Sequence, residues 1–247
     1  MVMQRDYRTR IYENYATNFQ NAEAHFDTAE SRQWGEAYAY YFRHWLPTVS
    51  DAQIVDLGCG RGRLLHFFQE RGYTHLQGVD ISQEQVSLAK QVSADVVQAD
   101  VLEFLEGARG RFDLITALDL VEHFSKPEVL RFLDGCFGAL KPGGRLILQT
   151  PNAESPWGTA YRYDDFTHEV EFTPNSLMRL LALAGFSAME PREAGPIPRR
   201  YSLSSSMRYL LWQCIRGGLL AWNFVETGSK GSGVVTRVFL CAATKLT

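Results

Sequence analysis

Three short apolar segments of this chain each lead into an acidic residue, at intervals close to one βα unit. The first contains Asp56 and runs into the glycine turn Gly58-Cys59-Gly60-Arg61-Gly62; the second ends in Asp80 and the third in Asp100. Because the carboxyl ends of parallel strands meet at one edge of a sheet, nucleotide-type ligands bind there. The spacing therefore predicts a pocket in which the glycine turn and the carboxylates contact successive parts of such a ligand.

The residue types in this pocket indicate which ligand it binds. A carboxylate about 20 residues after a glycine turn can accept hydrogen bonds from both ribose hydroxyls, so Asp80 alone leaves NAD open. The dinucleotide fingerprint requires a third glycine where this chain has Arg63. An acid at Asp100 suits an adenine amino group better than a second phosphate. Together with Asp56 and Asp119, these acids would repel a pyrophosphate and attract a sulfonium cation that also carries an ammonium group.

An alternation of strand and helix patterns positions these residues. Capping-box spacings begin two of the helices, at Ser82 and Ser125. Such alternation predicts an α/β fold, a Rossmann-like doubly wound sheet with helices on both faces. The expected strands are 53–57, 75–80, 95–99, 112–118, 145–150, 186–192 and part of 233–244, and the expected helices include 61–71, 101–106, one after Ser125 that stops near 141–144, and 174–184.

The same segments resemble the successive motifs of class I S-adenosylmethionine-dependent methyltransferases. The resemblance covers roughly residues 50–190. It implies a seven-stranded sheet whose last strand is antiparallel, S-adenosyl-L-methionine as the cofactor and S-adenosyl-L-homocysteine as the product. The residues that carry it are Val55–Gly62, Gly78-Val79-Asp80-Ile81-Ser82, Ala99-Asp100, Phe112-Asp113-Leu114-Ile115 with Glu122-His123, and Leu140-Lys141-Pro142-Gly143-Gly144.

This resemblance also implies a position for each part of the cofactor. The turn from Gly58 to Gly60 would hold the methionine part, Asp80 the ribose and Asp100 the adenine. Asp119 and Leu120 would border the methionine and the transferred methyl group. The full set of expected cofactor contacts is Asp56, Gly58, Cys59, Gly60, Asp80, Ile81, Asp100, Val101, Asp119 and Leu120.

A looser resemblance lies downstream, to the branch that includes ubiquinone-type O-methyltransferases and methyltransferases of polysaccharide gene clusters. It favours a sugar hydroxyl in polysaccharide, glycolipid or natural-product assembly as the methyl acceptor. A quinone-precursor O-methyltransferase, an N-methyltransferase and a partner subunit that binds the cofactor without catalysis are the alternatives. The resemblance is carried by Thr150-Pro151-Asn152-Ala153, Asp165-Phe166-Thr167-His168-Glu169, Phe172-Thr173-Pro174 and Ala184-Gly185-Phe186.

Two histidines are the candidates for catalysis. Methyl transfer from a sulfonium depends largely on aligning the acceptor with the methyl group. A hydroxyl acceptor must also lose a proton, for which histidine is suited near neutral pH. His168 lies in a polar loop after the fifth strand, and we expect it to be the base, oriented by Asp165 or Glu169. His123 is the second candidate; a local hydrogen bond in the loop is the alternative role for either histidine.

Two clusters of acids and histidines could hold a metal ion. One is Asp119, Glu122 and His123; the other spans 164–171 and includes His168. Carboxylate oxygens of this kind suit Mg²⁺, which some O-methyltransferases use to acidify a diol. A solvated acidic loop with N-cap roles is the favoured explanation, so no metal ligands are assigned and Mg²⁺ is the less favoured alternative.

The chain is expected to comprise two parts. Residues 1–50 read as two or three helices that either pack on the domain or form a lid over the pocket, and residues 51–247 form the methyltransferase domain. An amphipathic segment near 195–225 is inserted before the last strand. From 194 to 225 it contains no Asp or Glu but carries four arginines among tryptophans and leucines. It predicts a surface for an anionic lipid or a phosphorylated substrate, or alternatively a homodimer interface or a packed helix.

Composition excludes several other classes. A formal net charge of −3 gives no indication of nucleic-acid binding. The four cysteines are widely spaced without a CxxC pair, which argues against structural zinc or a disulfide framework. No signal peptide and no membrane-spanning run is recognised. We therefore expect a cytoplasmic enzyme acting on a small-molecule or lipid-linked acceptor, with contact at the inner membrane surface as an option.

Overall fold

A seven-stranded sheet with the order β3-β2-β1-β4-β5-β7-β6 forms the centre of the computed structural model, which describes residues 7–12, 25–93, 95–198 and 203–246. Strands β1 to β5 pair in parallel, whereas β7 is antiparallel to both of its neighbours. The predicted Rossmann-like sheet with an antiparallel last strand is confirmed. The strands are β1 (Gln53–Leu57), β2 (His75–Asp80), β3 (Val96–Gln98), β4 (Phe112–Leu118), β5 (Leu140–Pro151), β6 (Ser187–Glu193) and β7 (Val238–Thr244).

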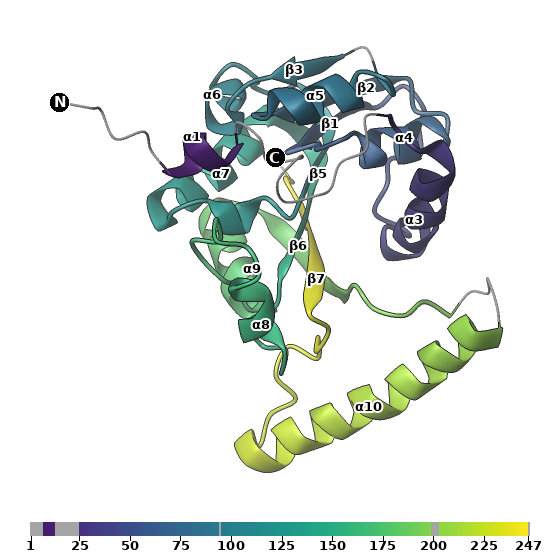
Figure 1. Ribbon diagram of the computed structural model, residues 1–247. Helices are drawn as coiled ribbons and strands as arrows, with labels where there is room; N and C mark the ends of the chain where they lie inside the picture. The colour runs from purple at the N-terminus through teal and green to yellow at the C-terminus, as the bar shows by residue number, and fades with distance from the viewer. Residues whose placement is uncertain (1–6, 13–24, 94, 199–202, 247) are drawn as a thin grey trace.

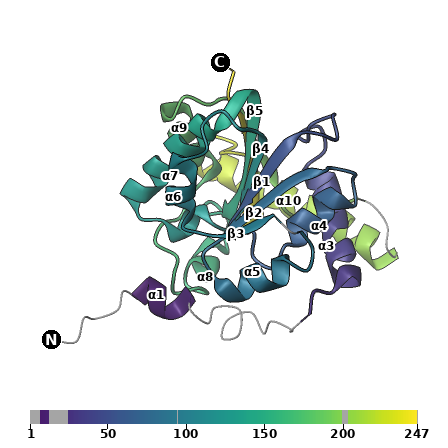
Figure 2. The same ribbon diagram turned by 90° about the horizontal axis from the view of Figure 1, so that it is seen from above.

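Helices cover both faces of this sheet (Figures 1 and 2). On one face α3 (Thr28–Tyr41), α4 (Arg63–Gln69) and α5 (Gln83–Ala89) contribute to a buried cluster with β1 and β2. On the other face α6 (Val101–Glu106), α7 (Lys126–Ala139) and α9 (Pro174–Leu183) bury a second cluster. The remaining helical elements are α1 (Tyr7–Tyr12), the 3-10 helix η1 (Val121–His123), α8 (Gly158–Arg162) and α10 (Leu203–Thr227).

Local sequence signals account for several element boundaries. Ser125 and Glu128 form the predicted capping box at the start of α7. Ser82 is the N-cap residue of α5, but its side chain makes no capping hydrogen bond, so the predicted capping box is absent there. The fifth strand begins at Leu140 rather than 145. Residues 141–144 extend it because Gly143 N–H donates to the Lys245 carbonyl and Lys245 N–H donates to Gly144.

The N-terminal helix α3 shares the core of the sheet. Phe42 and Trp45, just after this helix, are buried in the same cluster as α4. Ser31 Oγ lies 3.1 Å from His66 Nδ1, and a Cβ on Gly35 would lie 3.1 Å from Phe67. This part of the predicted appendage is therefore packed against the domain. The segment between α3 and α1 lies outside the described residues.

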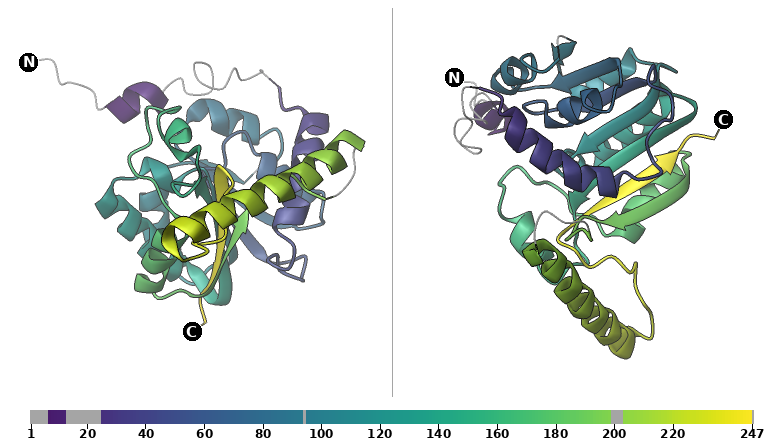
Figure 3. Two further views of the ribbon diagram at one scale, coloured as in Figure 1. Left: turned by 90° about the horizontal axis from the view of Figure 1, so that it is seen from below. Right: turned by 90° about the vertical axis from the view of Figure 1, so that its right-hand side faces the viewer.

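Helix α10 stands apart from both helical layers (Figure 3). It runs for 25 residues between β6 and β7, where the sequence predicts an inserted segment. Most of its side chains are exposed or half-exposed. Within the described part of the chain, no helix combines the length and apolar character needed to cross a membrane.

Candidate active site

A cavity of about 1220 Å³ opens at the carboxyl ends of β1, β2 and β4. The strand order reverses at β1, and ligands of doubly wound sheets bind at such a position. The side chains of Asp56 and Cys59 are buried behind the glycine turn and do not line the cavity. The other expected cofactor contacts do line it: Gly58, Gly60, Asp80, Ile81, Asp100, Val101, Asp119 and Leu120.

The glycine turn is fixed by its backbone and by Asp80. Gly58 has φ +67° and Gly60 φ +51°, in the left-handed region that favours glycine. A Cβ on Gly58 would also lie 3.1 Å from Leu120. Asp80 accepts hydrogen bonds from Gly60 N–H at 2.9 Å and from Ser82 N–H at 2.8 Å. The carboxylate of Asp80 thereby joins the end of the second strand to the glycine turn. These two hydrogen bonds also fix its orientation at the cavity wall.

Carboxylates with raised pKa values lie at the base of the site. Burial raises the pKa of Asp56 to about 7, although Thr116 Oγ1 donates to it at 2.7 Å. Burial also raises the pKa values of Asp80 and Asp119. Desolvated carboxylates are stabilised in their charged form by a nearby cation. A ligand with positive charge is therefore favoured here, as the sequence predicts.

Asp56 makes the stability of the unliganded protein depend on pH. A carboxyl whose folded pKa lies above its unfolded value stabilises the fold below pH 4, and this contribution is lost as pH rises through about 7. The amide oxygen of Asp56→Asn can still accept from Thr116. We expect the melting temperature of this variant to exceed that of wild type at pH 8, and to exceed it by much less at pH 5. Asp134→Asn, at an exposed position of α7, is the control. An equal difference in melting temperature at the two pH values would contradict the raised pKa of Asp56.

A chain of hydrogen bonds that begins on α3 orients the Asp119 side chain. Tyr38 OH donates to Gln149 Oε1 at 2.8 Å, and Gln149 Nε2 donates to Asp119 Oδ2 at 2.8 Å. Asp119 has φ +51°, a conformation that costs a non-glycine residue free energy and recurs at functional sites. Tyr38 and Gln149 line the cavity, and sequence reasoning missed both.

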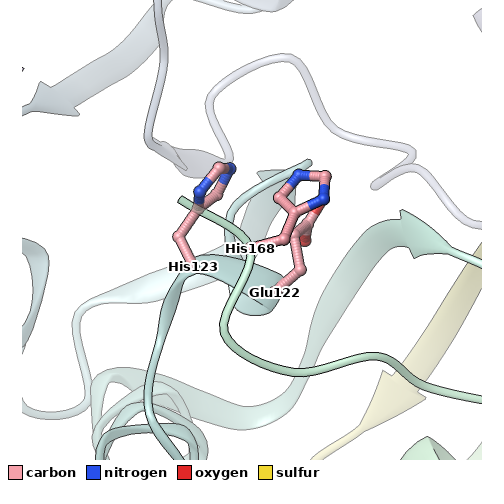
Figure 4. A group of neighbouring side chains, drawn as sticks. All are labelled: Glu122, His123 and His168. Carbon is pink, nitrogen blue, oxygen red and sulfur yellow. The ribbon is translucent and has the colours of Figure 1, made fainter. Parts of the chain in front are cut away.

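The two predicted catalytic histidines lie side by side. Their ring centroids are 4.9 Å apart, and both line the cavity. His123 ends η1, and the His168 loop is joined to η1 because the backbone N–H of Glu169 donates to the carbonyl of Glu122 at 2.8 Å. Figure 4 shows both imidazoles and the Glu122 side chain extending from these two segments toward the same side.

Hydrogen bonds define the tautomer of His123. Thr167 Oγ1 donates to Asp165 Oδ1 at 2.6 Å and lies 2.8 Å from His123 Nδ1. A hydroxyl has one proton, so with that proton on the bond to Asp165 the network assigns Nδ1 as the donor to Thr167 and the lone pair of the neutral ring to Nε2. Burial lowers the pKa of His123 to about 4, so the ring is neutral near pH 7. Asp165, which the sequence proposes as a partner of His168, thus supports His123 through Thr167.

Glu122 completes a potential metal site. It is 1% exposed; one carboxylate oxygen accepts from Thr150 Oγ1 at 3.0 Å, and the other has no hydrogen-bond partner among the residues that the structure describes. Burial raises the pKa of this carboxyl well above its usual range. One potential ligand atom from each of Glu122, His123 and His168 lies within 4.8 Å of the others. These residues fit a divalent cation, because an unpartnered carboxylate oxygen and an imidazole fixed through its other nitrogen are typical of metal ligands.

The N-terminal helices form one wall of the cavity. Arg8 and Tyr12 of α1 line it together with Trp34 and Tyr38 of α3. Arg8 forms an ion pair with Glu128 at 2.9 Å, and Tyr7 OH donates to Glu169. Helix α1 is thus attached to the loop that carries His168. Helix α3 therefore packs on the domain, and α1 lies at the cavity; a lid role for the appendage stays a prediction.

Comparison with known proteins identifies the family. A model of the methyltransferase domain matches residues 24–190, which is more than half of the chain. The chain belongs to this family. Ubiquinone biosynthesis O-methyltransferase of Dechloromonas aromatica (strain RCB) is 27% identical over 188 residues, which cover 66% of this chain and 78% of that protein. The protein of the same name from Coxiella burnetii (strain Dugway 5J108-111) is 32% identical over 111 residues, which cover 42% of this chain and only 46% of that protein.

Solved structures agree with this assignment. A crystal structure described as a SAM-dependent methyltransferase from Archaeoglobus fulgidus matches 97% of this chain and 100% of its own, with a TM-score of 0.63 and 20% identity, and so has the same fold. The predictions of a class I methyltransferase and of S-adenosylmethionine as its cofactor are confirmed. The roles of the individual site residues stay predictions.

Proposed function

We propose that this methyltransferase transfers the methyl group to a hydroxyl oxygen of a small aromatic acceptor. The observation that carries the proposal is the pair His123 and His168, placed beside Asp119 and Leu120 in one cavity. Asp119 and Leu120 are the positions expected to border the transferred methyl group. A basic imidazole beside that point suits a hydroxyl acceptor, whose proton must leave.

The proposed reaction is an in-line displacement. The acceptor oxygen attacks the methyl carbon, the carbon–sulfur bond breaks, and its electron pair remains on sulfur to give S-adenosylhomocysteine. His168 takes the hydroxyl proton. The carboxylates Asp80 and Asp119 hold the cofactor, and the cavity walls align the acceptor with the methyl group, which supplies much of the rate.

Three features support an aromatic acceptor over the sugar that the sequence favours. The relatives are named for ubiquinone biosynthesis. The cavity wall carries the aromatic rings of Tyr12, Trp34, Tyr38 and Tyr161, which suit a flat ring. A neighbouring cavity of about 640 Å³ beneath α10 shares Tyr41 and Tyr161 with the first and continues past Trp212 and Leu219, which gives room for an apolar tail. A quinone precursor, small or lipid-linked, combines these properties.

Mass spectrometry with isotopically labelled cofactor tests the proposal. The full chain is incubated separately with a catechol or hydroxylated quinone precursor, a sugar nucleotide and a primary amine. We expect label on a phenolic oxygen of the first. Label on the sugar would restore the polysaccharide hypothesis, and label on the amine would make the chain an N-methyltransferase. Binding of S-adenosylhomocysteine without transfer to any acceptor would favour a non-catalytic partner subunit.

The unpartnered oxygen of Glu122 favours a second role for the same side chains. With Glu122, His123 and His168 as ligands, a divalent cation would bind the acceptor oxygen and lower its pKa. His168 would then hold the metal instead of taking the proton.

Removal of metal separates the two roles. In the metal role, EDTA should abolish turnover, Mg²⁺ or Mn²⁺ should restore it, and calorimetry should detect Mn²⁺ binding that Glu122→Gln removes. In the base role, EDTA should change turnover by less than about twofold, since the proton passes directly to imidazole. Glu84→Gln, on the surface helix α5, is the matched control for calorimetry. Restoration by Mg²⁺ would overturn the base role of His168.

A further inference from the structure

Helix α10 faces the domain with a mixed side that includes Trp212, Arg216 and Leu219, and it leaves an apolar side exposed. Arg216 faces the domain, where it forms an ion pair with Glu193 at 3.1 Å and donates to the Gly233 carbonyl at 2.8 Å. Trp212 is half-buried beside Gly195, whereas Trp222 is 67% exposed. The two tryptophans therefore lie on different sides of the helix. Arg199 and Arg200 lie outside the described residues.

The exposed side of α10 carries a regular apolar stripe. Every member of the stripe is exposed, and none is charged. Successive members are separated by 4, 3, 4, 3 and 4 positions, the alternation that forms the seam of a coiled coil. The members are Met207, Leu211, Cys214, Gly218, Ala221 and Val225.

The sequence positions of the stripe residues are symmetric about position 216, which is occupied by Arg216. Met207 and Val225 lie nine positions on either side of it, Leu211 and Ala221 five, and Cys214 and Gly218 two. An antiparallel pair of such helices related by a two-fold axis would therefore place each stripe residue opposite another stripe residue. A two-fold interface requires this self-complementarity.

We propose that α10 pairs antiparallel with α10 of a second copy of this chain, with the stripe as the interface. Gly217 and Gly218 support this occupant, since a Cβ added at either would meet no atom within 4 Å in its own chain. Glycine inside a helix is unfavourable, and none of the described residues approaches this pair closely enough to require it. Close approach of a second helix does explain it, because small residues let two helix backbones come together.

The exposed area agrees with a dimer. Large apolar side chains of this type, at more than half exposure, present on the order of 100 Å² each. Five such side chains lie on or beside the stripe, and their sum of about 500 Å² is more than half of the roughly 800 Å² that each partner contributes to a standard interface. The side chains are Met207, Leu210, Leu211, Trp222 and Val225.

A lipid surface fits this face less well. Helices that lie on a membrane combine a large apolar face with Lys and Arg beside it. Of the two arginines that the structure describes on α10, Arg216 is instead paired with Glu193 and Arg208 borders the cavity beneath the helix, while the middle of the stripe, at Cys214, Gly218 and Ala221, carries no large side chain. The stripe has the features of a helix seam more than those of a lipid anchor.

Sedimentation equilibrium of the full chain tests the pairing. We expect wild type to have twice the 28.0 kDa chain mass at micromolar concentration, and Gly218→Arg and Leu211→Lys to be monomers. Gln213→Lys introduces a charge at an exposed position off the stripe and should remain dimeric. Unchanged S-adenosylhomocysteine affinity shows that each variant is folded. A wild-type monomer, or a dimer that survives both substitutions, would overturn the proposal.

Cysteine cross-linking tests the register. Cys214 is exposed, whereas Cys59, Cys136 and Cys241 are buried. We expect Gly218→Cys to form an intermolecular disulfide on mild oxidation, because position 218 faces Cys214 of the other copy, and Cys214→Ser in the same variant to prevent it. Gln213→Cys should cross-link poorly. No cross-link in Gly218→Cys would contradict the antiparallel register. Co-sedimentation of monomer with phosphatidylcholine–phosphatidylglycerol vesicles, lost in Leu211→Lys, would assign the stripe to lipid instead.

Discussion

Replacement of His168 by alanine is expected to lower turnover by about 10²–10⁴-fold, the usual contribution of a general base. The affinity for S-adenosylhomocysteine should stay unchanged, because the expected cofactor contacts lie on the glycine turn and after the ends of β2, β3 and β4. The measurement is the rate of methyl transfer at saturating acceptor, with calorimetry of S-adenosylhomocysteine on the same preparation. A loss of turnover with intact cofactor binding would place His168 on the acceptor side of the site.

His75→Ala is the matched control, since this exposed histidine begins β2 at the opposite end of the strand. Its turnover should equal that of wild type. If His168→Ala keeps full turnover, the base must be sought at His123, whose Nε2 carries the lone pair of the neutral ring. With a pKa of about 4, His123 would be a weak base but is neutral over the whole physiological range.

The sheet and its cofactor edge could be predicted because the signals for them are local. Strands β1, β2 and β4 have the predicted bounds, since each is a short apolar run that ends at a turn or a polar residue. Parallel pairing then brings Asp80, Asp100 and Asp119 to one edge without further information. Asp56 differs from the expected cofactor contact: it lies within β1, and its side chain is buried behind the turn instead of lining the cavity.

Contacts between segments that are distant in the chain could not be predicted from such local signals. Tyr38 and Gln149 are 111 positions apart, and only the packing of α3 across the end of the sheet brings them together to orient Asp119. The link from His123 through Thr167 to Asp165 likewise depends on how the loop after β5 folds over η1. The sequence contains both acid-and-histidine clusters, but their union into Glu122, His123 and His168 is a property of the fold.

The orientation of α10 is a further case. Its composition shows an amphipathic basic helix, and a basic amphipathic helix suggests an anionic surface. Which side faces the domain is decided by Glu193, which lies on β6 and pairs with Arg216. The apolar stripe is thereby left outside, and a pattern that predicts membrane contact becomes one that favours a second helix.

Replacement of Asp80 by alanine is expected to weaken cofactor binding, by a few kcal/mol at most. This carboxylate would accept both ribose hydroxyls, and a charge-assisted hydrogen bond contributes roughly 1.5–3 kcal/mol. Asp80 also holds Gly60 and Ser82, so the variant loses both the ribose contact and the support of the glycine turn. Calorimetry with S-adenosylhomocysteine should therefore show a Kd raised by about 10–100-fold, at 1.4 kcal/mol for each factor of ten.

Asp95→Ala is the control for this loss. Asp95 is an exposed carboxylate that precedes β3, at the end of the sheet away from the cavity, and its removal should leave the affinity unchanged. NAD should not bind to wild type, because Asp100 and Asp119 would repel its pyrophosphate. Unchanged affinity in Asp80→Ala would place the ribose elsewhere in the cavity. NAD binding without S-adenosylhomocysteine binding would contradict the charge argument itself, since the same acidic wall that attracts a sulfonium and an ammonium must disfavour two phosphates.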